Sequence, residues 1–293
     1  MASTKSTTKS TSKNDVKIGV IIFNAEQEYF DELVSGVKDA KDVFPDRDIT
    51  LEIRGISYHE NEQLEAIDEL VKKGVCGIIL TPFDTQAVRE KLLDLKKKKI
   101  SVVTVNSEID GADVLSYVGV DAYKSGQVAG GMLKLLSNKP AEIIIITGSN
   151  SISGHKDRVK GFVDTVTKGE KDVVIEEISE CLDDNYKAYE QVQKLAQLYP
   201  NADTFFFAAG GVYGGCKGIY QMTVRKNFNV ITFDDLPANR AYMENGTIDA
   251  SVCQNCNEQG YRSMYTLCDY LFNNVEPEEK QYMDVVIKIK ECL

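Results

Sequence analysis

The chain has 293 residues, of which 43% are hydrophobic, and this size and composition predict two domains with separate cores. Its formal net charge at pH 7 is −11. That excess of negative charge argues against broad electrostatic binding of nucleic acid, so any contact with DNA would need a separate domain.

Residues 1–15 are rich in serine, threonine and lysine and contain no apolar run. This pattern predicts a disordered tail or linker, and neither a secretory signal nor a membrane span.

The chain contains seven cysteines, an odd number scattered from Cys76 to Cys292, which suits a reducing cytosol better than a disulfide framework. We therefore expect a cytoplasmic protein without membrane insertion, or an extracytoplasmic one if a signal peptide has been removed.

The first unit with a clear pattern is Lys17–Ala40, in which the apolar run Ile18–Phe23 is followed by a polar loop and a helical segment. A strand–loop–helix unit in an α/β protein usually presents the loop at the strand's carboxyl end to a small ligand. The candidate ligand-facing residues of this unit are Phe23, Asn24, Gln27, Tyr29 and Phe30.

The same order of elements continues through the first half of the chain. The predicted strands are 49–56, 77–81, 102–105 and 116–120, and the predicted helices are 60–73, 87–99 and 123–136. The last of these helices contains Gly126, Gly130 and Gly131, which predict close packing on a neighbouring element.

The second half repeats the first. Glu142–Val166 again runs strand, polar loop and helix, and its Lys160-Gly161-Phe162 matches Ser35-Gly36-Val37 in the first unit. A second strand at 173–178, a helix at 187–198 and a strand–loop–helix–strand unit at 202–236 follow, and Asn106 and Asp234 close the two halves at equivalent places. The repeat predicts an α/β fold of two similar doubly wound parallel-sheet lobes whose strand ends face each other.

From residue 249 the order changes to a short strand at 250–254, a helix at 258–273 and one closing strand at 282–290. This order suggests that the chain crosses back to the first lobe and returns, with a hinge of three crossings near 106–121, 234–255 and 282–284. The expected domains are a tail at 1–15, an N-terminal lobe of 16–120 plus 255–282, and a C-terminal lobe of 121–254 plus 283–293.

Polar residues at the strand ends predict a ligand cleft. Asp234 directly follows an apolar strand, where its carboxylate can accept two hydroxyl hydrogen bonds from a sugar or polyol. Asn106 and Gln254 lie at other crossings, and Phe23 and Tyr29 could cover the apolar face of a sugar ring. The alternative is that Asp234 or Asp235 caps the next segment and the aromatic residues belong to the core.

Other chemistry is poorly supported. The glycine-rich loop 210–215 matches neither the dinucleotide fingerprint nor a P-loop, and Cys253-Gln254-Asn255-Cys256 has no second ligand pair for zinc. Only His59 and His155 could serve histidine-based catalysis, and no GxSxG surrounds Ser153. We therefore expect no cofactor, no metal and no enzymatic activity.

Seven segments in a fixed order carry a family resemblance: IGVIIFNAEQEYF, GIILTP, VVTVN, YVGVDAYKSGQVAG, DRVKGF, ITFDD and DASVCQ. On these segments, residues 16–293 resemble the type I periplasmic binding-protein superfamily, which includes ribose-binding proteins and the effector domains of lactose/galactose-repressor-family regulators. The resemblance implies two lobes joined by a three-crossing hinge.

The resemblance also implies a set of ligand contacts: Phe23, Gln27, Tyr29, Phe30, Asn106, Lys156, Asp184, Gly210, Asp234 and Gln254. Three positions depart from the ribose binders. Their Asp-Arg pair at the first crossing is Asn106-Ser107, their second-lobe arginine is Lys156, and their second-lobe Asn-Asp pair is Gly210-Gly211. Of Lys156 and Arg158, one is expected to face the cleft and the other solvent.

The resemblance makes the first functional hypothesis a ligand-sensing domain of a transcription regulator, which binds a sugar or related polar metabolite between its lobes. Such a domain would be a homodimer and would reach DNA only through a helix-turn-helix domain, which this chain lacks. The alternative is the solute-binding receptor of a sugar ABC importer. A third hypothesis is an enzyme that holds a nucleotide at residues 210–215.

Overall fold

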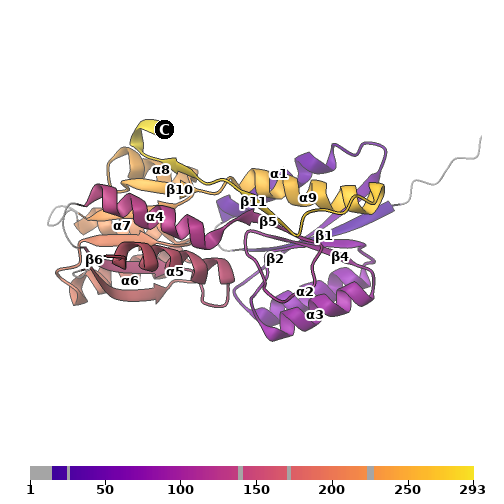
Figure 1. Ribbon diagram of the computed structural model, residues 1–293, viewed down its shortest axis with the longest axis horizontal. Helices are drawn as coiled ribbons and strands as arrows, with labels where there is room; N and C mark the ends of the chain where they lie inside the picture. Colours follow the sequence, from indigo (N-terminus) through magenta and orange to yellow (C-terminus); the bar gives the residue numbers. More distant parts are fainter. Residues whose placement is uncertain (1–14, 25–26, 138–140, 170–172, 223–227) are drawn as a thin grey trace, which may run out of the picture.

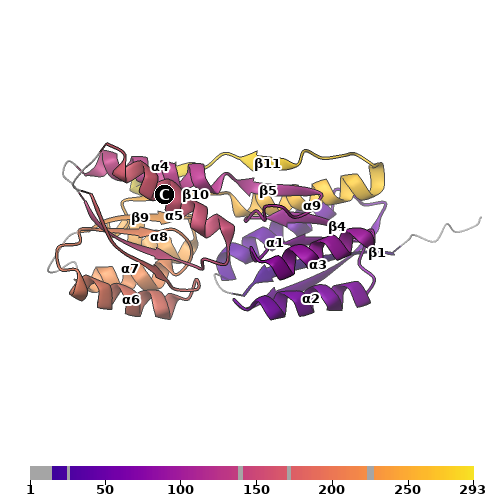
Figure 2. The same cartoon turned by 60° about the horizontal axis from the view of Figure 1, so that its bottom comes forward.

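The computed structural model describes residues 15–24, 27–137, 141–169, 173–222 and 228–293. Two α/β lobes lie side by side along the long axis of the molecule (Figures 1 and 2). Residues 1–14 of the predicted tail lie outside the described residues, whereas Asp15 already begins the first strand.

The first half of the chain alternates strands and helices. Its elements are β1 (Asp15–Phe23), α1 (Gln27–Lys41), β2 (Asp48–Ile56), α2 (Glu60–Lys72), β3 (Gly77–Leu80), α3 (Gln86–Lys97), β4 (Ser101–Val105), β5 (Ser116–Val120) and α4 (Ala122–Leu136). Together with β11 (Lys280–Met283), the first five strands form a parallel sheet in the order β11-β5-β4-β3-β1-β2.

The second half repeats this arrangement. Its elements are β6 (Glu142–Thr147), α5 (Ser153–Thr167), β7 (Val174–Glu180), α6 (Asn185–Leu198), β8 (Thr204–Phe207), α7 (Val212–Met222), β9 (Asn229–Phe233), α8 (Pro237–Glu244), β10 (Ala250–Cys253), α9 (Cys256–Asn273), β12 (Val286–Lys288) and the short 3-10 turn Lys290–Cys292. The second sheet has the order β12-β10-β9-β8-β6-β7, and only β12 is antiparallel. The predicted fold class is confirmed.

The central strands are buried on both faces, which explains why they appear in the sequence as unbroken apolar runs. All four residues of β3 and of β8 are buried, as are five of the six in β6. One hydrophobic cluster fills the first lobe, and two further clusters cover the faces of the second sheet. Each lobe therefore has its own core.

Two helix pairs pack through glycines, α1 against α9 and α4 against α5. A Cβ atom on Gly36 would lie 1.9 Å from the carbonyl oxygen of Asn257, and one on Gly126 would lie 2.1 Å from that of Arg158. The predicted close packing of Gly126 and Gly130 is confirmed, but that of Gly131 is wrong, because a Cβ there would meet open space.

The chain passes between the lobes after β5, after β10, and between β11 and β12 (Figure 1). The prediction of one closing strand at 282–290 is wrong, because this segment pairs with both sheets in turn. Met283 pairs with Val120 in the first sheet, whereas Val286 pairs with Cys253 in the second. Two residues, 284 and 285, make the crossing between these short strands.

Candidate functional site

Asn106 and Asp234 occupy equivalent positions in the two lobes. Each follows a strand in the left-handed conformation, with φ of 68° and 63°. The N–H of Asn106 donates to Val118 O and that of Asp234 donates to Val252 O, both at 3.1 Å. Both residues line one cavity between the lobes, so the two strand-end edges face each other across a shared gap.

This cavity measures about 20 Å³. Its lining residues are Phe23, Tyr29, Phe30, Tyr58, Thr81, Asn106, Ile152, His155, Arg158, Asp183, Ala209, Gly210, Asp234 and Gln254. The structure thus brings together seven predicted site residues, namely Phe23, Tyr29, Phe30, Asn106, Gly210, Asp234 and Gln254. That they contact a ligand stays a prediction.

A buried polar cluster forms the C-terminal side of the cavity. The carboxylate of Asp234 accepts hydrogen bonds from the backbone N of Gln254 at 3.1 Å and from its Nε2 at 2.8 Å. The Arg158 guanidinium donates to Ala208 O at 3.1 Å and to Gln254 Oε1, and lies 4.3 Å from the centre of the Phe233 ring. Burial raises the pKa of Asp234, and the positive charge of Arg158 opposes that rise.

Arg158, and not Lys156, is the cation in this cavity. Arg158 is 3% exposed and shares the buried face of α5 with His155 and Phe162, at spacings of three and four residues. Burial lowers the pKa of His155, whose Nδ1 accepts from Ser149 N at 3.0 Å. The helical spacing of these three residues is the signal in the sequence that could have identified the inward face.

Aromatic rings form the N-terminal side of the cavity. The rings of Phe23 and Tyr58 stack with centroids 4.4 Å apart and an interplanar angle of 8°, and Phe83 meets Phe23 edge-on at 5.2 Å. The Tyr58 hydroxyl donates across the cleft to Asp183. On the same side, Asn106 Nδ2 donates to the Tyr29 hydroxyl at 2.6 Å. Sequence analysis did not single out Tyr58, which lies just after β2.

Asp184 lies outside the cavity lining, and its neighbour Asp183 lies within it. Asp184 caps helix α6, because its side chain accepts from Lys187 N at 2.8 Å. Asp183 has φ of 55° and accepts from Gly210 N at 2.9 Å. The side chain of Gln27 lies outside the described residues.

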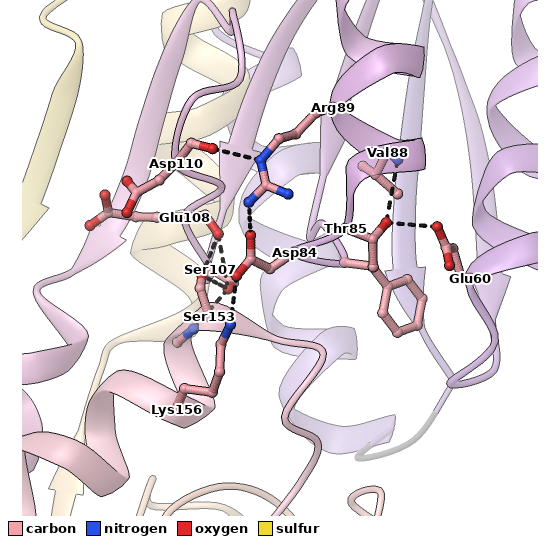
Figure 3. A network of polar contacts seen from close by, with 12 residues as sticks. Glu60, Asp84, Thr85, Val88, Arg89, Ser107, Glu108, Asp110, Ser153 and Lys156 are labelled. Atoms are coloured by element: carbon pink, nitrogen blue, oxygen red, sulfur yellow. Dashed lines mark hydrogen bonds and ion pairs between the residues drawn. The ribbon is translucent and has the colours of Figure 1, made fainter.

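Lys156 does not line the cavity and instead bridges the two lobes (Figure 3). Its Nζ lies 2.6 Å from an oxygen of Asp84, whose other oxygen pairs with Arg89, and the backbone N of Asp84 donates to Ser151 O at 2.8 Å. Burial raises the pKa of Asp84, but Lys156 and Arg89 together outweigh it and leave that pKa below its usual value.

A second contact between the lobes lies next to this bridge. Ser107 Oγ accepts from the backbone N of Gly154 at 3.1 Å and lies 3.0 Å from Ser153 Oγ, which also donates to Glu108 O (Figure 3). The first turn of α5 therefore contacts both the loop that carries Asp84 and the first crossing.

Replacing Lys156 with glutamine is expected to shift the lobes toward an open arrangement. Lys156 is 42% exposed, so solvent screening limits the change in the closed-to-open ratio to about twofold to fivefold. Small-angle X-ray scattering at low salt would detect this shift as a larger radius of gyration, and high salt should reduce the difference.

The ion pair between Asp84 and Lys156 should also depend on pH. Because pairing lowers the pKa of Asp84, the ion pair is complete at neutral pH and is lost as the pH falls through that pKa.

Lys160→Gln is the matched control. Lys160 lies on the same helix and pairs with Asp164, four residues away in the same lobe. An equal expansion in both variants would show that Lys156 does not hold the lobes together.

The prediction of a loop at 210–215 is wrong for most of the segment, because α7 begins at Val212. Gly210 lines the cavity, and Gly211 has φ of 81°. A Cβ on Gly214, in the first turn of α7, would lie 1.7 Å from the carbonyl oxygen of Asn185, so this glycine lets α7 approach the start of α6.

Within the described residues, no helix is both long and apolar enough to cross a bilayer.

Among curated proteins, the chain is 20% identical over 274 residues to the ribose import binding protein RbsB of Salmonella typhimurium, covering 94% of this chain and 90% of the relative. Among solved structures, it is similar to GanP, a glucose-galactose binding protein from Geobacillus stearothermophilus (24% identity, 96% and 99% coverage, TM-score 0.88).

A further similar structure is a protein from Bacteroides fragilis described as a candidate LacI transcriptional regulator (22% identity, 94% and 98% coverage, TM-score 0.86). These two structural similarities show a shared fold. A family model described as a periplasmic binding protein domain matches residues 18–274, which is most of the chain. The chain therefore belongs to the periplasmic binding protein domain family.

Proposed function

We propose that this chain binds a sugar between its lobes, at the residues that line the cavity, without catalysing a reaction, and that binding holds the lobes together. The cavity of about 20 Å³ has room for about one water molecule, so its walls must move apart to admit a sugar ring. One observation carries the proposal: the Asp234, Gln254 and Arg158 cluster faces the stacked rings of Phe23 and Tyr58 across one cavity. The names of the ribose and glucose-galactose binding relatives support it.

The chemistry of the two walls suits a sugar. Hydroxyl groups can donate to the Asp234 carboxylate and accept from a guanidinium or amide, while aromatic rings cover the apolar face of the ring. Two buried polar atoms, Thr81 Oγ1 and Arg158 Nε, have no hydrogen-bond partner in the described part of the chain. A ligand with several hydroxyl groups would supply such partners, and their pairing would favour its binding.

Of the two biological settings, the solute-binding receptor of a sugar importer is favoured, because the curated relative that covers 94% of the chain is an import binding protein. In that setting the chain would bind its ligand outside the cytoplasm. The effector domain of a transcription regulator is the second candidate, supported by the similar Bacteroides fragilis structure. Light scattering after gel filtration separates them, since a dimer favours the regulator and a monomer the receptor.

Isothermal titration calorimetry with ribose, arabinose, xylose, glucose and galactose tests the proposed function. At least one sugar is expected to bind with a one-to-one stoichiometry and to be recovered chemically unchanged after incubation. Absence of binding for every sugar would overturn the proposal, and tight binding of ATP or NAD would favour the nucleotide-binding enzyme instead. Conversion of a bound sugar would overturn the claim that the chain only binds.

A further inference from the structure

A second compartment of about 180 Å³ lies between the lobes, against the cavity of about 20 Å³ described above. Glu28 contributes from the N-terminal lobe, and the other lining residues come from the C-terminal lobe. The Glu28 carboxylate accepts from the backbone N of Ala238 at 3.2 Å, in the first turn of α8. Both lobes therefore meet at this compartment, as they do at the cavity.

The compartment is lined by the same loops as the cavity. At the ends of β7, β8 and β9, one residue lines the cavity and the residue two positions later lines the compartment. These pairs are Asp183 and Asn185, Gly210 and Val212, and Asp234 and Leu236. The two spaces therefore lie near each other at the carboxyl ends of the same three strands.

The side chain of Asn239 indicates that the compartment binds a polar ligand. It is 4% exposed and lines the compartment, yet its side-chain amide has no hydrogen-bond partner in the described part of the chain. Its backbone N is satisfied by Leu236 O at 2.9 Å, so the unpaired groups belong to the side chain. An amide offers two donors and an acceptor, so the side chain of Asn239 can form hydrogen bonds with a polar ligand in the compartment.

Tyr213 adds an aromatic surface to the compartment. Its side chain is 43% exposed, and its ring lies 5.6 Å from that of Tyr242, which limits its orientation. An aromatic ring with a free face can cover the apolar face of a sugar, while Val212 and Leu236 supply apolar walls. An amide beside an aromatic ring repeats the mixture of groups found in the cavity.

We propose that this compartment is a second subsite and that the ligand is a saccharide of two rings, one in the cavity and one against Tyr213 and Asn239. This inference rests on the proposed function, because it places the first ring in the cavity lined by Asp234. It adds that the compartment of about 180 Å³ binds the second ring of the ligand.

Calorimetry on the whole chain tests the subsite with ribose, glucose and galactose against cellobiose, lactose and melibiose. We expect one disaccharide to bind at least tenfold more tightly than either of its component sugars. Tyr213→Ala should lose about tenfold in affinity for that disaccharide and leave the monosaccharide affinity unchanged. Asn239→Ala should show the same selective loss, provided that its thermal unfolding matches that of the wild type.

Tyr220→Ala is the matched control. Tyr220 lies on the same helix, is 53% exposed and also contacts the Tyr242 ring, at 6.4 Å, but it does not line the compartment. If a monosaccharide binds as tightly as every disaccharide, or if Tyr213→Ala and Tyr220→Ala behave alike, the subsite is refuted and the proposed function stands. If none of these sugars binds, the subsite is refuted, and if arabinose and xylose also fail to bind, the proposed function fails with it.

Discussion

Asp234→Ala is expected to weaken sugar binding by about 2 to 3 kcal/mol, roughly 30- to 150-fold in Kd, because hydrogen bonds to a buried charged group are lost. The substitution also leaves Arg158 without the carboxylate that opposes its charge, and frees the Gln254 amide that Asp234 now accepts from. Calorimetry with the sugar that the wild type binds most tightly gives the difference directly.

Asp235→Ala provides the control for this measurement. Asp235 is the next residue, but its carboxylate pairs with Arg240 at 2.9 Å and with Lys288, and it does not line the cavity. We expect this variant to lose some stability and to keep its sugar affinity. An affinity for Asp234→Ala equal to that of the wild type would remove Asp234 from the binding site.

Gly161→Val is expected to destabilise the fold by about 3 kcal/mol, the upper part of the usual range for overpacking. A Cβ at this position would lie 2.0 Å from the carbonyl oxygen of Tyr123, and a backbone carbonyl cannot move aside as a flexible side chain can. Urea unfolding followed by circular dichroism measures the loss. Because α5 carries Arg158, sugar affinity should fall as well.

Gly131→Ala is the matched control for the α4–α5 contact. Gly131 lies on α4, its φ is not in the left-handed region, and a Cβ there would meet nothing within 4 Å. Alanine should leave stability unchanged or raise it by about 0.5 to 1 kcal/mol, since glycine is unfavourable inside a helix. If Gly161→Val unfolded at the same urea concentration as the wild type, the close helix contact would be wrong.

The repeated pattern of strands and loops was sufficient to predict the architecture from the sequence. Parallel strands buried on both faces produce apolar runs that are easily recognised, and their ends locate Asn106 and Asp234 without knowledge of the packing. The same logic fails at 282–290, where nothing in the local sequence shows that neighbouring short strands join different sheets.

The direction of side chains on α5 was harder to predict. Lys156 and Arg158 lie in the same turn, and the one sequence signal that separates them is the helical spacing of Arg158 with His155 and Phe162, which the packing of α5 turns into a buried face. Tyr58 was missed for a related reason. Its place depends on the stack with Phe23, a contact between residues 35 positions apart that no local pattern encodes.

The order of elements along the chain has a consequence for biosynthesis. Strands β6 to β10 are contiguous from residue 142 to 253, so most of the second sheet can assemble on a nascent polypeptide as it leaves the ribosome. Helix α1 must wait, because α9, whose glycine Gly260 fits against Leu33, is translated about 220 residues later. The lobe that is begun first therefore stays incomplete until nearly the whole chain has been made, because α9 and β11 are both translated after residue 255.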